Sequence, residues 1–290
     1  MKPAPFRYTD PTDLASALAT LTAEPEAKVL AGGQSLMPLL AMRLARPDVI
    51  VDLSRVDSLR EIRVGAHGEL SLGAMVTHGR LVESEEVRSG WPLLAYAARL
   101  IGHEAIRTRG TIGGSLVHAD PAAELPCCVT LLDGVLTLER DGGESRSVPA
   151  SEFFITYLTT DVQPGEILTR IELPAPPPRS GMAFEEIARR SGDFALAGAG
   201  AVVSLAPDGR VADARVGLCG VSGTPVVVTG LEPLLGGHRG SGADFEAVAE
   251  AVRADLEPDD DLHASAEYRR HVAGVAAVRA LRRALEHAGV

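Results

Sequence analysis

Two short segments with adjacent glycines are the part of this 290-residue chain best suited to bind a ligand. The first consists of Ala31, Gly32, Gly33, Gln34 and Ser35, and the second of Thr111, Ile112, Gly113, Gly114 and Ser115. Because glycine has no side chain, backbone N–H groups in such segments can turn inward and approach an anion, and the hydroxyl groups add donors. Two such segments could hold a diphosphate. A single pair of adjacent glycines is also typical of an ordinary turn, so the pattern alone leaves both interpretations open.

The first glycine segment lies where a small β-loop-α-β unit is predicted. Residues 29–31 are a short apolar strand candidate, the stretch up to Arg46 is compatible with a helix, and residues 49–53 form a second apolar strand candidate. An earlier helix is expected as well, because Asp10 resembles an N-cap, Pro11 suits the first helical position, and leucines then recur at helical spacing. The unit would place the first segment at the end of a strand.

The second glycine segment lies in a region where antiparallel hairpins dominate. Segments 61–64 and 69–74 flank a glycine-containing turn, and segments 134–139 and 145–148 flank another. Between these hairpins, residues 91–101 have helical character. Asp120 and Pro121 resemble an N-cap and first helical turn before a helix that extends toward residue 132.

A proline-rich stretch at residues 174–178 predicts a linker between two domains, since proline removes backbone donors and favours extended backbone. Strand candidates follow at 182–187, 199–205 and 211–218, and the chain ends in a helical apolar stripe. We therefore predict an α+β protein. Domain 1–176 would contain a small βαβ-like subdomain at about 1–55 and an antiparallel-sheet subdomain at 56–176. A smaller α+β domain, 177–290, would combine a short antiparallel sheet with helices.

Composition narrows the function classes. The formal net charge of −11 disfavours binding to nucleic acid or to anionic membranes, and no segment approaches the length of an apolar membrane span. The N-terminus lacks the apolar core of a signal peptide, and three cysteines cannot form a disulfide framework, so we expect a cytoplasmic protein. Three cysteines also cannot supply the four ligands of a typical iron–sulfur cluster.

Common motifs of other chemistries are missing from the sequence. There is no complete GxGxxG fingerprint, no P-loop lysine motif, no HExxH metal motif and no GxSxG nucleophile motif. We therefore expect neither a protein-bound metal nor a catalytic side chain of the hydrolase type.

A family resemblance gives the glycine segments a specific interpretation. Two segments of this chain are AGGQSLMPLLAMRLARPDVIVDLS and IRTRGTIGGSLVHADPAAELP. They resemble the two FAD-binding signatures of the medium subunit of carbon monoxide dehydrogenase and related molybdenum hydroxylases. The FAD-binding subunits of xanthine dehydrogenases belong to the same family. The likeness continues through GEILTRIELPAP, ARRSGDFALAGAGAVVSL and ASAEYRRHVAGVAAVRALRRAL. It covers nearly the whole chain and keeps the order of the motifs, which makes it far more specific than either pair of glycines.

The resemblance implies that the two glycine segments wrap the diphosphate and ribityl chain of a noncovalent FAD. It implies that Asp120 contacts flavin hydroxyl groups, a role compatible with capping a helix, and that Arg107 is a weaker candidate contact. Two departures from the family pattern affect details of affinity: Gln34 replaces a common histidine and Ser115 a common asparagine, and both retain hydrogen-bonding capacity.

Three apolar residues are implied near the flavin ring. Ile167 and Leu168 occupy the place where the family has a residue packed against the isoalloxazine, although sequence alone predicts only a half-buried strand there. Phe194 matches a position that is often aromatic and could control access to the ring, and an ordinary core role is the alternative.

The resemblance also implies the kind of assembly. The family carries a molybdopterin cofactor in a large subunit and two [2Fe–2S] clusters in a small subunit, arranged as a dimer of heterotrimers. FAD in the medium subunit would pass electrons from the clusters to NAD, a quinone or oxygen as the external acceptor. Two alternatives are an independent flavin oxidoreductase and a flavin-free assembly subunit that retains the fold.

Overall fold

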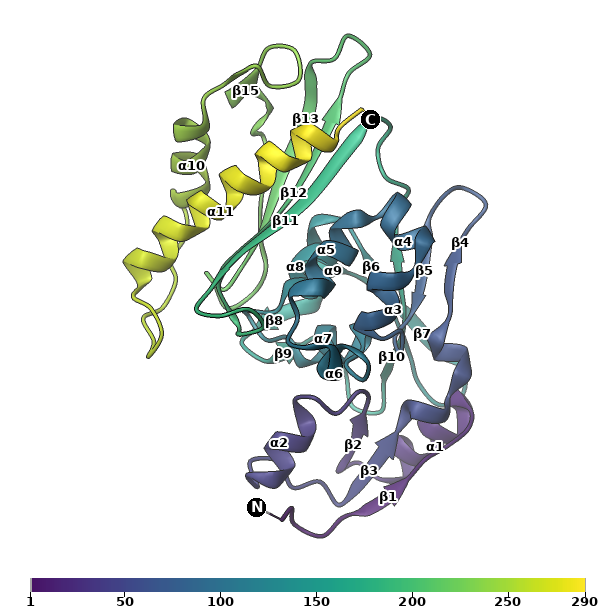
Figure 1. Ribbon diagram of the computed structural model, residues 1–290. Helices are drawn as coiled ribbons and strands as arrows, with labels where there is room; N and C mark the ends of the chain where they lie inside the picture. The colour runs from purple at the N-terminus through teal and green to yellow at the C-terminus, as the bar shows by residue number, and fades with distance from the viewer. Residues whose placement is uncertain (1, 290) are drawn as a thin grey trace.

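The computed structural model describes residues 2–289 and contains helices and sheets in three successive parts (Figure 1). The first part is a parallel sheet of β1 (Arg7–Thr9), β3 (Val49–Asp52) and β2 (Ala27–Leu30), in that order. It is joined by α1 (Leu14–Ala23) and α2 (Leu36–Ala41). The predicted small βαβ-like unit is confirmed, with one further strand, β1, that the sequence did not predict.

Two local predictions in this first part are wrong. Helix α1 begins after Asp13, whose side chain accepts the Ser16 N–H at 2.8 Å, and not after Asp10. Both aspartates are suitable caps, and the apolar positions of the helix start at Leu14. Helix α2 ends well before Arg46 because Arg43 adopts a left-handed φ of 61°.

The second part is a five-stranded antiparallel sheet. Its order is β4 (Ile62–Val64), β5 (Leu70–Gly73), β10 (Ile167–Leu173), β6 (Val135–Glu139) and β7 (Ser145–Pro149). The two predicted hairpins are confirmed, and the last strand of the region, β10, lies between them. A small hairpin of β8 (Phe154–Thr156) and β9 (Thr159–Thr160) precedes β10.

Helices connect and cover this sheet. They are α3 (His78–Glu83), α4 (Glu85–Gly90), α5 (Pro92–Leu100), α6 (Glu104–Arg107), α7 (Ile112–His118), α8 (Glu124–Leu131) and α9 (Ala150–Phe153). The predicted helix at 91–101 is confirmed as α5. Helix α8 begins at Glu124, so Asp120 is not its N-cap; its carboxylate instead accepts the Ala122 N–H at 2.9 Å in a preceding turn.

The third part is an antiparallel sheet of β11 (Ser180–Ala188), β12 (Ala195–Leu205), β13 (Val211–Cys219) and β14 (Val226–Val228). Helices α10 (Phe245–Arg253) and α11 (Ala266–His287) cover one face, and β15 (Leu235–Gly236) pairs with β16 (Gly242–Ala243) beside them. The segment between β10 and β11 contains no helix or strand, and the Trp91 indole N–H donates to Pro174 O at its start.

Small residues let the second and third parts pack closely. Alternate alanines of β12 join the core under α11, while Gly200, which lies between two of them, faces α5 and α8. A Cβ at Gly200 would lie 3.1 Å from Leu131, and one at Gly217 would lie 3.1 Å from the sulfur of Cys127. The α+β class and the two-domain design are therefore confirmed, and the interface between the domains is part of the hydrophobic core.

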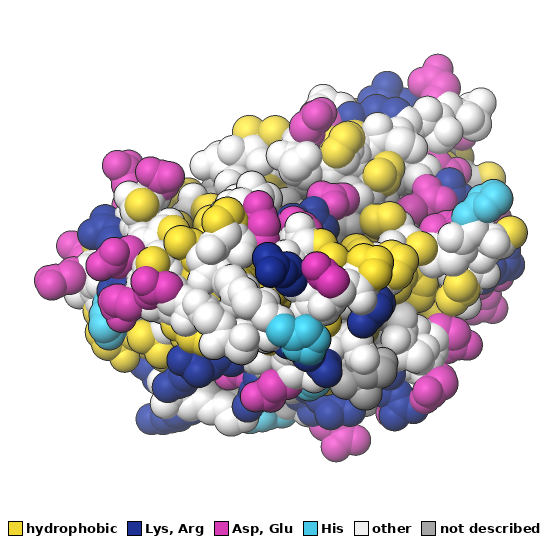
Figure 2. Space-filling view, turned by 90° about the horizontal axis from the view of Figure 1, so that it is seen from above, with side chains coloured by type: hydrophobic (Ala, Val, Ile, Leu, Met, Phe, Trp, Pro, Cys, Tyr) yellow, Lys and Arg dark blue, Asp and Glu magenta, His cyan; other side chains and the backbone are white. Residues whose placement is uncertain are grey.

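Acidic and basic side chains intermingle on the face drawn in Figure 2, and no large patch of one sign forms there. Within residues 2–289, no helix is long and apolar enough to cross a membrane.

Candidate functional site

The two glycine segments contact each other, although they are 80 residues apart in the chain. A Cβ at Gly32 would lie 2.1 Å from the carbonyl oxygen of Arg109 and 2.7 Å from the Cα of Gly110, directly before the second segment. A Cβ at Gly114 would lie 3.4 Å from the Cβ of Ala31. Only glycine at position 32 permits this backbone contact, so the fold itself brings the two segments into one site.

The first glycine segment offers backbone donors. Among the described residues, the N–H groups of Gly32, Gly33, Gln34 and Ser35 donate to no protein acceptor. Gly33 adopts a left-handed φ of 72°, and the Gln34 amide folds back to donate to Gly32 O at 2.9 Å. Unpaired neighbouring N–H groups in a partly exposed turn are the donor set that a phosphate group needs.

The second glycine segment differs from the expectation that its N–H groups also face an anion. Ile112 donates to Val76 O and Gly113 to Ala74 O, both at 2.9 Å. Thr111 is the N-cap of α7, and its hydroxyl oxygen accepts the Gly114 N–H at 3.0 Å. Ser115 N–H is used within the helix. These donors are therefore committed to the fold, and the half-buried Ser115 hydroxyl is the donor that stays available.

Two predicted polar contacts take part in other interactions. One guanidinium nitrogen of Arg107 lies 2.9 Å from Gly102 O and 3.2 Å from both Arg99 O and Ile101 O, so this side chain caps the end of α5. One carboxylate oxygen of Asp120 accepts the Ala122 N–H. Asp120 also lines the cavity that is described next.

The cavity has a volume of about 490 Å³ and lies between the two domains. Asp120 and Tyr157 contribute from the first domain, and Phe194 and Arg269 from the second. Phe194 is 71% exposed, which excludes an ordinary core role and fits the expected place beside an opening. The cavity therefore joins two of the predicted residues, Asp120 and Phe194.

A buried arginine fixes the second-domain wall of the cavity. Arg269 donates to Leu196 O at 2.8 Å, to Gly220 O at 3.0 Å and to the Asp261 carboxylate at 2.6 Å. The hydrogen bond from Arg269 lowers the pKa of Asp261 well below its usual value. On the opposite wall, a hydrogen bond to Asp259 raises the pKa of Tyr157. Sequence reasoning missed Arg269, because a helical pattern does not show where an arginine is buried.

Ile167 and Leu168 are buried rather than half-buried, with 3% and 4% of their surface exposed. They begin β10, which has a neighbouring strand on each side, and their side chains join different cores. Ile167 packs with the first subdomain, and Leu168 packs with the helices of the second. The sequence correctly predicted a strand, but not that both of its faces are covered.

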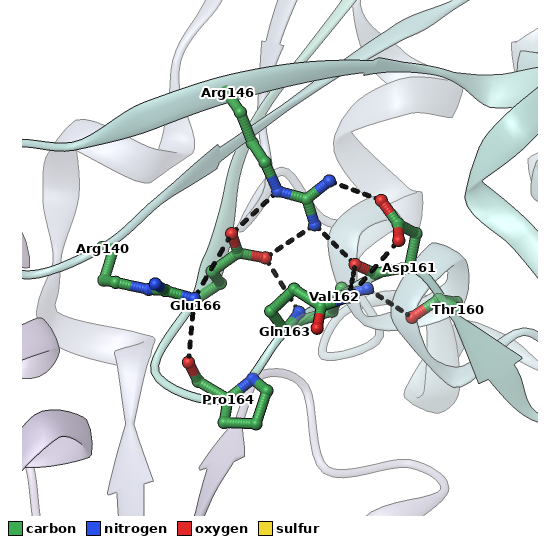
Figure 3. A network of polar contacts seen from close by, with 8 residues as sticks. All are labelled: Arg140, Arg146, Thr160, Asp161, Val162, Gln163, Pro164 and Glu166. Carbon is green, nitrogen blue, oxygen red and sulfur yellow. Dashed lines mark hydrogen bonds and ion pairs between the residues drawn. The ribbon is translucent and has the colours of Figure 1, made fainter.

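An ion-pair network braces the turn that leads into β10 (Figure 3). Arg146 donates to both carboxylate oxygens of Glu166 at 2.8 Å and also contacts the carboxylate of Asp161. Glu166 additionally accepts the Gln163 N–H at 2.8 Å. Burial opposes ionisation of Glu166, but these hydrogen bonds prevail and its pKa is lowered. The network fixes the turn directly before Ile167.

The chain is similar to known proteins over nearly its whole length. Residues 4–176 match the FAD binding domain in molybdopterin dehydrogenase, and residues 182–284 match the CO dehydrogenase flavoprotein C-terminal domain. The chain is 38% identical over 289 residues to the alpha subunit of the 6-hydroxypseudooxynicotine dehydrogenase complex of Paenarthrobacter nicotinovorans, covering 99% of this chain and 97% of that one. It is 35% identical to the carbon monoxide dehydrogenase medium chain of Hydrogenophaga pseudoflava, covering 97% of each.

The fold also matches a solved structure over nearly its whole length. Quinoline 2-oxidoreductase from Pseudomonas putida 86 superposes with a TM-score of 0.91 at 37% identity, covering 99% of both chains. The fold and the site thus define an FAD-binding subunit of an oxidoreductase. More specifically, the chain belongs to the family of medium subunits of molybdenum hydroxylases of the carbon monoxide dehydrogenase type.

Proposed function

We propose that this chain binds FAD noncovalently and conducts electrons between partner subunits and an external acceptor. The observation that carries the proposal is the direct contact of the two glycine segments, with four unpaired N–H groups in the first of them. The residues fit the cofactor because this donor set suits a diphosphate and because a 490 Å³ cavity lined by Asp120 and Phe194 is available for a flavin ring.

In this proposal each group of residues has a distinct task. The first glycine segment and the Ser115 hydroxyl hold the diphosphate. The rest of the second segment packs against the first segment and fixes its position. Asp120 accepts hydrogen bonds from flavin hydroxyls. Ile167 and Leu168, whose side chains are buried in two different cores, support the ring indirectly by fixing the start of β10. Phe194 limits access to it. When bound, FAD supplies the redox chemistry, and the protein supplies orientation and exclusion of water.

The proposed partners follow from the family. A small subunit with two [2Fe–2S] clusters would deliver electrons, and a large subunit with molybdopterin would oxidise the primary substrate, in a dimer of heterotrimers. The acceptor would be NAD, a quinone or oxygen, reached in the cytoplasm. Co-purification of the native complex tests this arrangement: a lone chain that is active as a flavoprotein would instead indicate an independent oxidoreductase.

Flavin uptake by the purified chain tests the central proposal. We expect the unaltered chain to bind FAD and the variant Gly114→Leu to lose it, because a side chain there would meet Thr111 Oγ1 at 2.9 Å and press toward Ala31. Flavin absorbance per protein is the measurement. A folded, colourless chain that does not take up added FAD would contradict the proposal and favour an assembly subunit. Full flavin occupancy in Gly114→Leu would contradict the proposed binding of the diphosphate by the two glycine segments.

A further inference from the structure

His78 is a buried titratable side chain that the proposed function does not yet use. It begins α3, is 5% exposed, and within residues 2–289 neither ring nitrogen makes a hydrogen bond of normal geometry. Burial lowers its pKa to about 4, an effect that the backbone of Thr111 opposes and the charge of Arg107 reinforces. The ring is therefore uncharged at neutral pH. Because an unpaired buried polar group is costly, its position needs an explanation.

The ring lies directly against the start of the second glycine segment. A Cβ on Gly110 would lie 2.9 Å from Cε1 and 3.0 Å from Nδ1 of His78, so the ring and the Gly110 backbone are in close contact. The backbones are also joined, since His78 N–H donates to Gly110 O at 2.9 Å and Thr77 forms a bridge with Thr111.

Gly110 links this ring to the first glycine segment. Its Cα would lie 2.7 Å from a Cβ on Gly32, so Gly110 contacts both the His78 ring and the segment with the unpaired N–H groups. A shift of Gly110 by a few tenths of an ångström would therefore move Gly32 and change the proposed diphosphate-binding site. Well-packed interiors transmit such shifts because they contain little free space.

We propose that His78 is a positioning residue for FAD: its flat, uncharged ring fixes Gly110, and Gly110 fixes the spacing between the two glycine segments. This inference rests on the proposed function and adds a residue outside both glycine segments. His78 acts on the cofactor through Gly110 and makes no contact with FAD itself.

The close contact allows a test by compensating volumes. His78→Ala removes the ring, and Gly110→Ala adds a methyl group where the ring lies. Each single variant of the full chain should bind FAD at least about tenfold more weakly, and the double variant should regain most of that affinity, because the methyl occupies the vacated space. His78→Phe retains a flat uncharged ring and should bind FAD within about threefold of the unaltered chain. Titration of FAD fluorescence measures the dissociation constants.

Controls separate positioning from general damage. His67→Ala removes an exposed histidine from the β4–β5 turn and should leave FAD affinity unchanged. Thermal unfolding of the flavin-free proteins reports the stability of each variant. A purely structural role would lower the unfolding temperature of His78→Ala without the compensation in FAD affinity.

The outcomes are distinguishable. FAD binding by a folded His78→Ala variant as tight as that of the unaltered chain would overturn the inference while leaving the proposed function intact. A double variant that stays unfolded, or folds and binds no better than the single variants, would also overturn it. Failure of the unaltered chain to bind FAD would instead count against the proposed function.

Discussion

At the scale of single residues, Gly32 makes the most demanding contact of the site. We predict that Gly32→Ala weakens FAD binding by about tenfold or more, since overpacking costs about 1–3 kcal/mol and the new methyl would meet backbone atoms of Arg109 rather than a flexible side chain. Flavin absorbance of the purified variant checks this. Gly90→Ala is a matched control, because nothing lies within 4 Å of a Cβ there. Equal flavin occupancy in both variants would show that the contact does not control the site.

The residues of the site could be predicted only in part from sequence. The family signatures correctly predicted the FAD-binding class, and the role of the two glycine segments in holding FAD stays a prediction. They did not show that Gly113 N–H is taken by Ala74 O, or that His78 lies against Gly110, because both contacts join residues that no local pattern relates. The distinction between a glycine that binds and one that packs depends on these tertiary neighbours.

At the scale of elements, the turn before β10 determines where Ile167 and Leu168 begin their strand. We predict that Arg146→Met lowers the free energy of unfolding by about 1–3 kcal/mol, because Glu166, whose side chain is 6% exposed, loses its principal partner. The loss should be largest near neutral pH and fade as Glu166 is protonated, since a lowered pKa stabilises the fold only above the ordinary carboxyl range. Urea unfolding at several pH values measures it.

The exposed pair of Arg63 and Glu61 provides the control for this prediction. Arg63→Met should change stability by less than about 0.5 kcal/mol, because solvent screens a pair in which the arginine side chain is 71% exposed. If both variants lost the same stability, the network of Figure 3 would be no more important than an ordinary surface pair.

Elements themselves were predicted where the pattern is local. The hairpins and α5 follow from alternation, turns and helical periodicity, and the structure confirms them. Strand β1 has only three residues and exists through its parallel pairing with β3, 40 residues later, so its own sequence carries no strand signal. Helix α1 shows a related limit, because Asp10 and Asp13 are equally suitable caps and the packing of Leu18 and Leu21 selects the second.

At the scale of the whole molecule, two acidic side chains face each other where the domains meet. Glu124 starts α8 in the first domain and Glu186 lies on β11 in the second, and among residues 2–289 neither has an ion-pair partner. Burial and mutual repulsion raise the pKa of Glu124 to about 8, and burial raises that of Glu186 to about 7. Glu186 Oε2 is buried and has no hydrogen-bond partner among the described residues. A proton shared with Glu124 would give this oxygen a hydrogen bond.

Because of this pair, we expect the free energy of unfolding to decrease at alkaline pH. Both folded pKa values exceed the ordinary 4.5, so the folded state holds protons that the unfolded state releases, and stability falls as pH rises through 7 and 8. We predict that the unaltered chain loses about 1 kcal/mol of unfolding free energy between pH 7 and 8. Glu186→Gln should lose less, because it removes one carboxyl and its repulsion of Glu124, while the burial of Glu124 remains.

Urea unfolding at pH 7 and pH 8 measures this difference, with Glu250→Gln on the exposed face of α10 as the control. His78 and Glu166 do not interfere, because their lowered pKa values affect stability only at more acidic pH. An identical pH dependence in the unaltered chain and Glu186→Gln would show that the two carboxyls do not share a proton. A parallel loss of FAD between pH 7 and 8 would further show that loosening this interface opens the neighbouring cavity, since Asp120 and Ala122 of its lining directly precede Glu124.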